Sequence, residues 1–128
     1  MATILGIPLA LALLFFSLCI ETIVSLKVVH VISNMPKDSP PLHINCMANG
    51  ANVVQYFLTV GEDYEWSATI NDVYNCMTMW WASIAYWHAY EPKRDVEHDT
   101  IFSRIEEDGF FLSYDKSKWK KIADWQTD

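Results

Sequence analysis

The sequence predicts an all-β protein, a small antiparallel β-sandwich of about eight strands with one disulfide. After residue 25, short runs of alternating apolar and polar residues are separated by turn-forming Gly, Pro, Asn and Asp. Residues 73–95 also hold three of the six tryptophans and three of the six tyrosines. Residues 74–81 and 85–90 are apolar at both alternating sets of positions, which is typical of two central strands. We expect Pro92–Asp95 to form the turn that closes this pair.

Residues 1–25 are expected to be a secretory signal peptide, with cleavage after Ser25. Residues 4–20 form an uncharged apolar run, as in the hydrophobic region of such a peptide. The alternative is a membrane span. The run is short for a hydrocarbon core of about 30 Å, and no basic cluster follows it. We therefore expect a secreted domain, residues 26–128, with no membrane insertion after cleavage.

The charge of the expected mature chain restricts its partners. Nine basic against fifteen acidic residues leave −6 once Glu21 is removed with the signal peptide. An acidic surface argues against nucleic acid and anionic membrane, and it suits a basic or polar protein surface.

Two cysteines, Cys46 and Cys76, remain after cleavage. In an exported chain such a pair most simply forms a disulfide. The alternative, a reactive thiol, requires an activating base and leaves a partner thiol unpaired.

The other elements follow from the same alternation. Strands are expected near residues 27–33, 42–47, 56–60, 64–70, 101–105 and 110–112, with loops at 34–41, 48–52, 61–63, 71–72 and 96–99. Glu107–Gly109 is a hairpin signal. In the tail, Trp119, Ile122 and Trp125 are spaced three apart as on a helix, but residues 119–125 also alternate as an edge strand. The strand count favours the edge strand.

No catalytic or metal-binding motif stands out, so we expect neither an enzyme nor a cofactor. The four histidines lie in different predicted elements. The Glu97-His98-Asp99 triplet offers ligands for a divalent ion, but neighbours on an extended chain point to opposite sides, so we expect no metal. Exposed aromatic residues, with Trp87 as the candidate to test, could instead stack on sugars, although most are expected to pack in the core.

The order of the motifs resembles the plant self-incompatibility S1 family, also called S-protein homologues. The similarity comprises Lys27-Val-x-His-Val-Ile-Ser-Asn-Met-Pro, Ser39-Pro-Pro-Leu-x-Ile-x-Cys, Val60-Gly-Glu-Asp-Tyr-x-Trp, the Cys76 strand leading to Trp80-Trp81, Tyr90-x-x-Lys-Arg-Asp, Glu107-Asp-Gly-Phe-Phe-Leu, and Trp119 with Trp125. It extends over essentially the whole mature chain. Unlike many members, this chain has no second cysteine pair and no N-glycosylation sequon.

The resemblance implies a secreted β-sandwich that acts as a signalling ligand for a membrane receptor ectodomain on another cell, in pollen–stigma recognition or a related developmental or defence role. We expect a monomer that recognises its receptor through loops 36–41, 48–52 and 93–99. The candidate contact residues are Lys37, Asp38, Ser39, Asn49, Asn52, Lys93, Arg94, Asp95, Glu97 and His98. The alternative function is a secreted carbohydrate- or cell-wall-binding module that uses exposed aromatic side chains.

Overall fold

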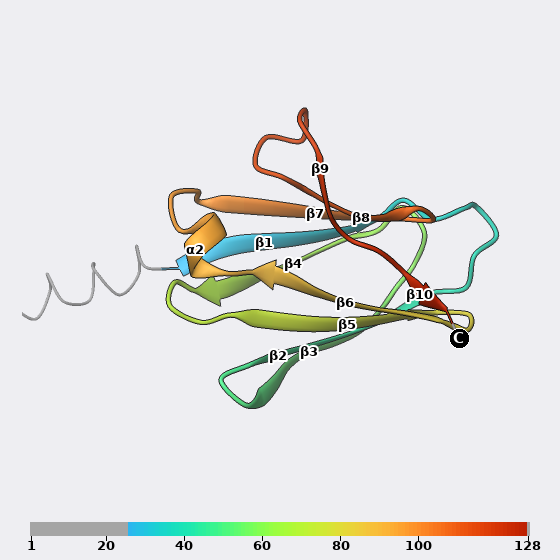
Figure 1. The fold of residues 1–128 in the computed structure, drawn as a ribbon, viewed down its shortest axis with the longest axis horizontal. Helices are drawn as coiled ribbons and strands as arrows, with labels where there is room; N and C mark the ends of the chain where they lie inside the picture. The colour runs from blue at the N-terminus through green and yellow to red at the C-terminus, as the bar shows by residue number, and fades with distance from the viewer. Residues whose placement is uncertain (1–25, 128) are drawn as a thin grey trace, which may run out of the picture.

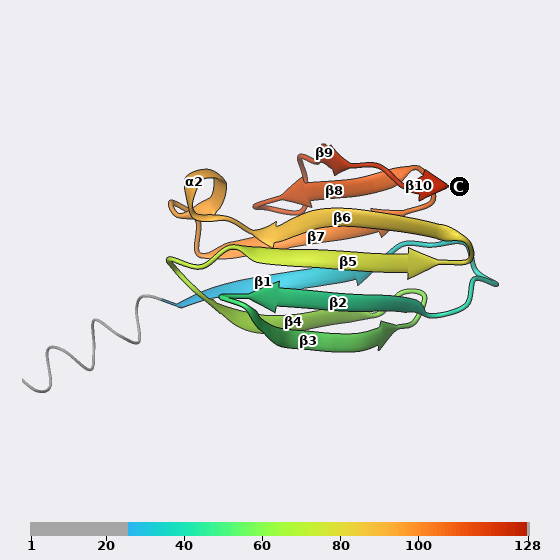
Figure 2. The same ribbon diagram turned by 60° about the horizontal axis from the view of Figure 1, so that its bottom comes forward.

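The computed structural model describes residues 26–127, and two five-stranded sheets pack face to face in it (Figures 1 and 2). The expected signal peptide lies outside the described residues. The strands are β1 (Leu26–Ser33), β2 (Leu42–Ala48), β3 (Ala51–Leu58), β4 (Asp63–Thr69), β5 (Tyr74–Trp80), β6 (Ser83–Tyr90), β7 (Thr100–Glu106), β8 (Gly109–Ser113), β9 (Lys120–Ala123) and β10 (Gln126–Thr127). One helical turn, α2 (Pro92–Asp95), follows β6.

The strand order within each sheet confirms the predicted sandwich and refines it. Sheet I has the order β4-β1-β7-β8-β9, and sheet II has the order β10-β6-β5-β2-β3. All pairs are antiparallel except β1 with β7, which is parallel and joins two strands far apart in sequence. The expected count of about eight strands becomes ten because the tail supplies two short edge strands.

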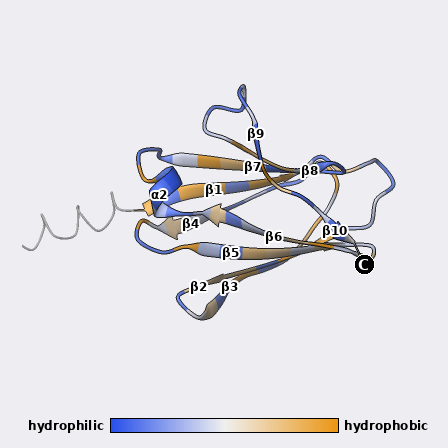
Figure 3. Cartoon of the chain, in the orientation of Figure 1, coloured by the Kyte–Doolittle hydropathy of each residue, from blue (hydrophilic) through white to orange (hydrophobic). Residues whose placement is uncertain are grey.

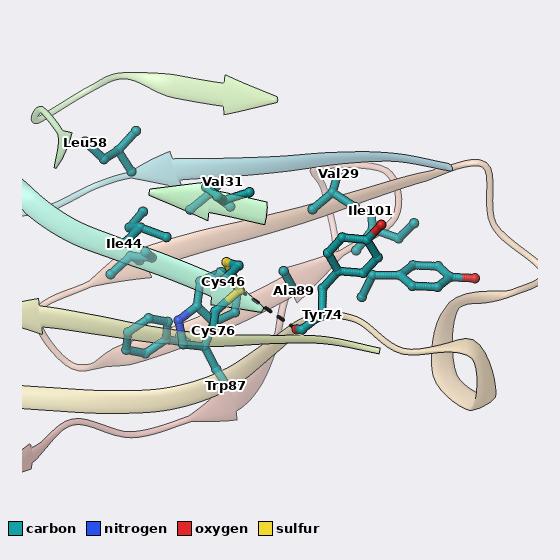
Figure 4. Packing of buried hydrophobic residues seen from close by; sticks show 14 of the residues in the cluster. Val29, Val31, Ile44, Cys46, Leu58, Tyr74, Cys76, Trp87, Ala89 and Ile101 are labelled. Atoms are coloured by element: carbon teal, nitrogen blue, oxygen red, sulfur yellow. Dashed lines mark hydrogen bonds between the residues drawn. A yellow bond between two sulfur atoms is a disulfide. The ribbon is translucent and has the colours of Figure 1, made fainter. Parts of the chain in front are cut away.

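The core lies between the sheets and includes the disulfide (Figure 4). Cys46 and Cys76 face each other on adjacent strands β2 and β5, so the bridge crosses within sheet II and its side chains point inward. Beside it, the indole Nε1 of Trp87 donates to Oγ1 of Thr78 at 2.9 Å, which satisfies two buried polar groups. The predicted disulfide is therefore confirmed.

Aromatic side chains close both long sides of the sandwich. On one side, neighbouring ring centroids lie 4.1 to 6.4 Å apart along the series Tyr56, Tyr64, Trp66, Tyr74 and Tyr90. On the other, Trp125 contacts both Trp80 and Phe110, and Phe110 also contacts Trp87. Most of the aromatic surface that the sequence concentrates is thus used in packing, as predicted.

The turns differ from the expected loops in two places. The β2–β3 connection is only Asn49-Gly50, both with positive φ, as a two-residue hairpin requires, so the expected loop 48–52 was too long. The two strands of the aromatic stretch are joined at Trp81-Ala82, not at Pro92–Asp95. The segment 92–95 is the helical turn α2, which carries the chain from sheet II to β7 of sheet I.

The tail follows the edge-strand alternative. β9 pairs antiparallel with β8, and the chain then crosses to pair β10 with β6. The last strands therefore connect the edges of the two sheets, as Figure 1 shows.

Candidate recognition surfaces

The ten residues proposed for receptor contact do not form one surface. Lys37, Asp38 and Ser39 lie in the loop that joins β1 to β2 at one end of the sandwich. The Asn49-Gly50 turn and α2 lie at the opposite end (Figure 1). Asn52 belongs to β3, where it pairs with Met47. Loops at opposite ends of the strands cannot contact one flat partner surface together.

Asp95 is wholly buried, which corrects its assignment as an exposed contact residue. Figure 3 shows α2 as hydrophilic, although its last residue, Asp95, is buried. The Asp95 carboxylate accepts hydrogen bonds from Nε and Nη2 of Arg94, both at 2.7 Å, and from the Glu91 N–H at 2.9 Å. The Tyr114 hydroxyl donates to the same carboxylate at 2.6 Å. Asp95 therefore fixes the conformation of this corner.

The pKa values around this carboxylate reflect its charge. Burial raises the pKa of Tyr114 well above the usual value, and the hydrogen bond to Asp95 raises it further. Burial lowers the pKa of Arg94, but its hydrogen bonds to Asp95, together with the attraction of the Asp95 and Glu91 charges, outweigh that effect and leave the pKa raised. The positive charge of Arg94 is thus compensated within the fold by the Asp95 carboxylate.

His98 and Asp99 of the Glu97-His98-Asp99 triplet make separate contacts. The His98 ring stacks on Tyr114 with centroids 3.5 Å apart. The carboxylate of Asp99 lies 3.5 Å from Nζ of Lys27. Within residues 26–127, no group of three or more His, Cys, Asp or Glu side chains is placed to hold a metal ion.

The outer face of sheet II is uncharged and partly apolar, a feature that the sequence analysis missed. Its strand positions carry no Asp, Glu, Lys or Arg: His43, Asn45 and Met47 on β2, Val53, Gln55 and Phe57 on β3, Asn75, Met77 and Met79 on β5, and Ile84, Tyr86 and His88 on β6. We call these twelve residues the sheet II face. Phe57 is 64% exposed and Tyr86 60% exposed. The prediction that both sides of residues 74–90 are buried was wrong.

The outer face of sheet I is of a different kind. His30 lies between two carboxylates, with Nδ1 2.9 Å from Asp63 and Nε2 3.3 Å from Glu65. Nε of Arg104 lies 3.1 Å from Glu106 on the same face. Charged groups are thus present on sheet I and missing from the sheet II face.

The sugar-stacking candidate Trp87 is unavailable to a ligand. It is 4% exposed, and its indole N–H is already bonded to Thr78. Within residues 26–127, no helix is long and apolar enough to cross a membrane.

Fold and surface together define a small disulfide-linked β-sandwich with one uncharged outer face. The chain belongs to the plant self-incompatibility protein S1 family, whose model matches residues 28–125. It is similar in structure to a solved self-incompatibility protein homologue, described as one of a widespread family of small, highly stable, secreted proteins from plants. The two share 14% identity with a TM-score of 0.58, and the match covers 79% of this chain and 96% of the other. No curated protein matches this chain.

Proposed function

We propose that this protein is a secreted ligand that acts by binding a receptor ectodomain through the sheet II face, and not by catalysis. The observation that carries the proposal is that a chain of net charge −7 leaves one whole sheet face without Asp, Glu, Lys or Arg while exposing Phe57, Met79 and Tyr86. Contiguous exposed apolar surface of this kind is typical of interaction sites.

The chemistry of this face suits the centre of an interface. Aromatic side chains contribute most to binding when they are fully desolvated in a partner's pocket, and Phe57 and Tyr86 are available for that. His43 stacks on Phe57 with ring centroids 4.7 Å apart, which holds the phenyl ring in place before binding. An uncharged centre also avoids the cost of desolvating unpaired charges.

The margin of the face indicates the charge of the partner. Asp72, Glu91 and Asp124 lie in the segments that connect to β5, β6 and β10. A receptor with basic residues opposite Asp72 and Glu91 would complement this part of the margin, and opposite charge would mainly accelerate association. Two copies of a mature chain with net charge −6 repel each other, so we expect the ligand to be a monomer.

Secretion is supported by the predicted signal peptide, by the disulfide and by the description of the solved relative as a secreted plant protein. The intact mass of the secreted product provides a check. It should correspond to residues 26–128 and be two hydrogens below the reduced mass. A full-length product would contradict cleavage after Ser25.

The receptor proposal is tested by saturable binding of labelled protein to intact plant cells. The double variant Phe57→Ala/Met79→Ala should bind about tenfold more weakly or worse, since it truncates two exposed contacts without touching the core. The matched control is Val28→Thr, an exposed residue on the outer face of sheet I, which should bind as the wild type does. Equal affinities for all three proteins would show that the sheet II face is not the contact surface.

A further inference from the structure

Six of the nine basic residues gather at one corner of this acidic protein. Lys93 and Arg94 are in α2, and Lys116, Lys118, Lys120 and Lys121 are in the loop after β8 and in β9. The Tyr114 hydroxyl lies 3.0 Å from the Arg94 carbonyl oxygen and joins the two segments. We call these six residues the basic corner.

The lysine-bearing loop is held in a fixed conformation. The Asp115 carboxylate accepts the backbone N–H groups of Ser117 at 2.8 Å and Lys118 at 3.0 Å. The Ser113 hydroxyl accepts the N–H of Lys116 at 2.8 Å, and the Trp119 indole donates to the Lys116 carbonyl at 3.1 Å. A preordered loop loses little backbone entropy when it binds a ligand.

Most of the cations at this corner are not neutralised by the protein. Arg94 pairs with Asp95, and Lys121 pairs with Asp124. In the part of the chain that the structure describes, no carboxylate lies within ion-pair distance of Lys93, Lys116, Lys118 or Lys120. One carboxylate, Glu91, lies at this corner, and it is 2.6 Å from Nδ1 of His88. Clustered, unpaired like charges are unfavourable alone and become favourable when an anion binds.

Two adjoining hollows open beside these cations. One, of about 520 Å³, is lined by Tyr86 and His88 of β6 and by Lys121 of β9. The other, of about 290 Å³, is lined by Lys118 and Trp119. Arg94, Lys120 and Ile122 line both hollows. Together they form a trough along the gap between the edge of sheet II and the edge of sheet I.

We propose that this trough binds an anionic polysaccharide whose sugar rings carry carboxylate groups. Lys118 and Lys120 would contact the carboxylates. The Tyr86 ring and the face of Trp119 that is not covered by the Arg104 guanidinium, which lies 4.1 Å from the ring centroid, would pack against the sugars, as amphipathic aromatic side chains do. In a polymer of charged sugar rings, successive sugars would make both kinds of contact, one sugar in each hollow. The two proposed sites share Tyr86 and His88, which belong to the sheet II face and line the first hollow, whereas Lys118 and Lys120 belong to the trough alone.

An acidic peptide fits the trough less well. An extended peptide would bind by adding a strand to the free edge of β6. Only a short part of that edge is free. At one end β10 pairs with Ile84, and at the other Nη2 of Arg94 donates to the His88 carbonyl oxygen at 3.0 Å. Little backbone remains for strand addition, so recognition must come from the side chains.

Isothermal titration calorimetry at low salt tests the proposal with three probes: a de-esterified polygalacturonate fragment, the same fragment fully methyl-esterified, and polyglutamate. The wild-type protein should bind the first and neither of the others. The variant Lys118→Gln/Lys120→Gln should bind the de-esterified fragment about tenfold more weakly or worse. Lys37→Gln changes an exposed lysine in the β1–β2 loop at the other end of the molecule and should bind as the wild type does.

Three results would overturn this proposal: no binding of the de-esterified fragment by the wild type, an equal loss for Lys37→Gln, or equally tight binding of polyglutamate. The last would indicate charge attraction or a peptide site. These results would leave the receptor proposal unaffected, because the variant that tests it, Phe57→Ala/Met79→Ala, retains every lysine of the basic corner. Conversely, that variant should bind polygalacturonate normally even if it no longer binds cells.

Discussion

The Tyr114 hydroxyl donates a hydrogen bond to the buried Asp95 carboxylate at 2.6 Å and thereby ties the end of sheet I to the end of sheet II. Tyr114 follows β8, and Asp95 ends the helical turn that follows β6. The Tyr114 ring also stacks on the His98 ring. The Asp95 carboxylate thus holds together α2 and the segment after β8, and both of these carry residues of the basic corner.

This relationship predicts a large effect of substitution at Asp95. Asp95→Asn should lower the free energy of unfolding by about 3 kcal/mol, because it leaves Arg94 partly buried without its counter-charge. Tyr114→Phe should lower it by about 1 to 2 kcal/mol, since it removes one hydrogen bond to a charged group. Urea unfolding of both single variants and the double variant measures the coupling between them.

The control for this cycle is Asp38→Asn, an exposed carboxylate in the β1–β2 loop, which should change stability by less than about 0.5 kcal/mol. If Asp95→Asn changed stability as little as Asp38→Asn, Asp95 would not organise the corner. Additive effects of Asp95→Asn and Tyr114→Phe would show that the hydrogen bond contributes nothing of its own.

Gly109 begins β8 at a position where a side chain does not fit. Its φ is +144°, and a Cβ there would lie 2.6 Å from Cε of Lys121 and 2.9 Å from the Ala123 carbonyl oxygen. Gly109→Ala should therefore lower the free energy of unfolding by about 1 to 3 kcal/mol and disturb the β8–β9 pairing. Gly61→Ala is the matched comparison, because its φ of +84° is also positive but nothing lies within 4 Å. A smaller loss at Gly109 than at Gly61 would contradict the close approach.

The disulfide should be both stabilising and protected. Cys46→Ala/Cys76→Ala should lower the free energy of unfolding by about 3 to 4 kcal/mol, the value that the chain-entropy model gives for a loop with this sequence separation of 30. The cysteines are 0% and 3% exposed, so reductant and alkylating reagent should modify them only when denaturant is present. Rapid alkylation of the reduced protein under native conditions would contradict this burial.

Acid should weaken the lysine loop through Asp115. The N–H groups of Lys118 and Ser117 and the Ser113 hydroxyl hold the pKa of Asp115 well below its usual value. Because the folded-state pKa is depressed, the stabilisation is complete above the unfolded value of about 4 and is lost as the pH falls below it. Between about pH 5 and 2 the thermal midpoint of the wild type should fall more than that of Asp115→Asn.

A second carboxylate, elsewhere in the fold, provides a comparison within the same titration. Glu62, which accepts hydrogen bonds from Tyr56 and from the N–H of Thr59, also has a lowered pKa. The Asp115→Asn protein should therefore retain part of the acid dependence. Melting curves that fall equally for the wild type and Asp115→Asn would exclude Asp115 as a contributor.

The sequence by itself determined the strands, the turns with special backbone requirements and the covalent link. Alternation placed the inward side chains of β2, β4 and β7, because a strand exposes successive residues to opposite sides. Gly109 marked a hairpin through its tolerance of positive φ, whereas the Asn49-Gly50 turn was expected only as part of a longer loop. Two cysteines in a short chain expected to be exported left one simple pairing.

Only the tertiary structure decided which side of each strand is covered by other parts of the chain. The apolar residues Met79 and Tyr86 suggested a strand buried on both faces, but no second layer packs on the sheet II face in the described chain. Asp95 was expected to be exposed because it lies in the expected loop 93–99, yet Arg94 and Tyr114 compensate its charge inside the fold. The parallel pairing of β1 with β7 likewise joins strands some seventy residues apart. Local periodicity specifies the side to which a residue points, whereas burial depends on partners that lie far away in the chain.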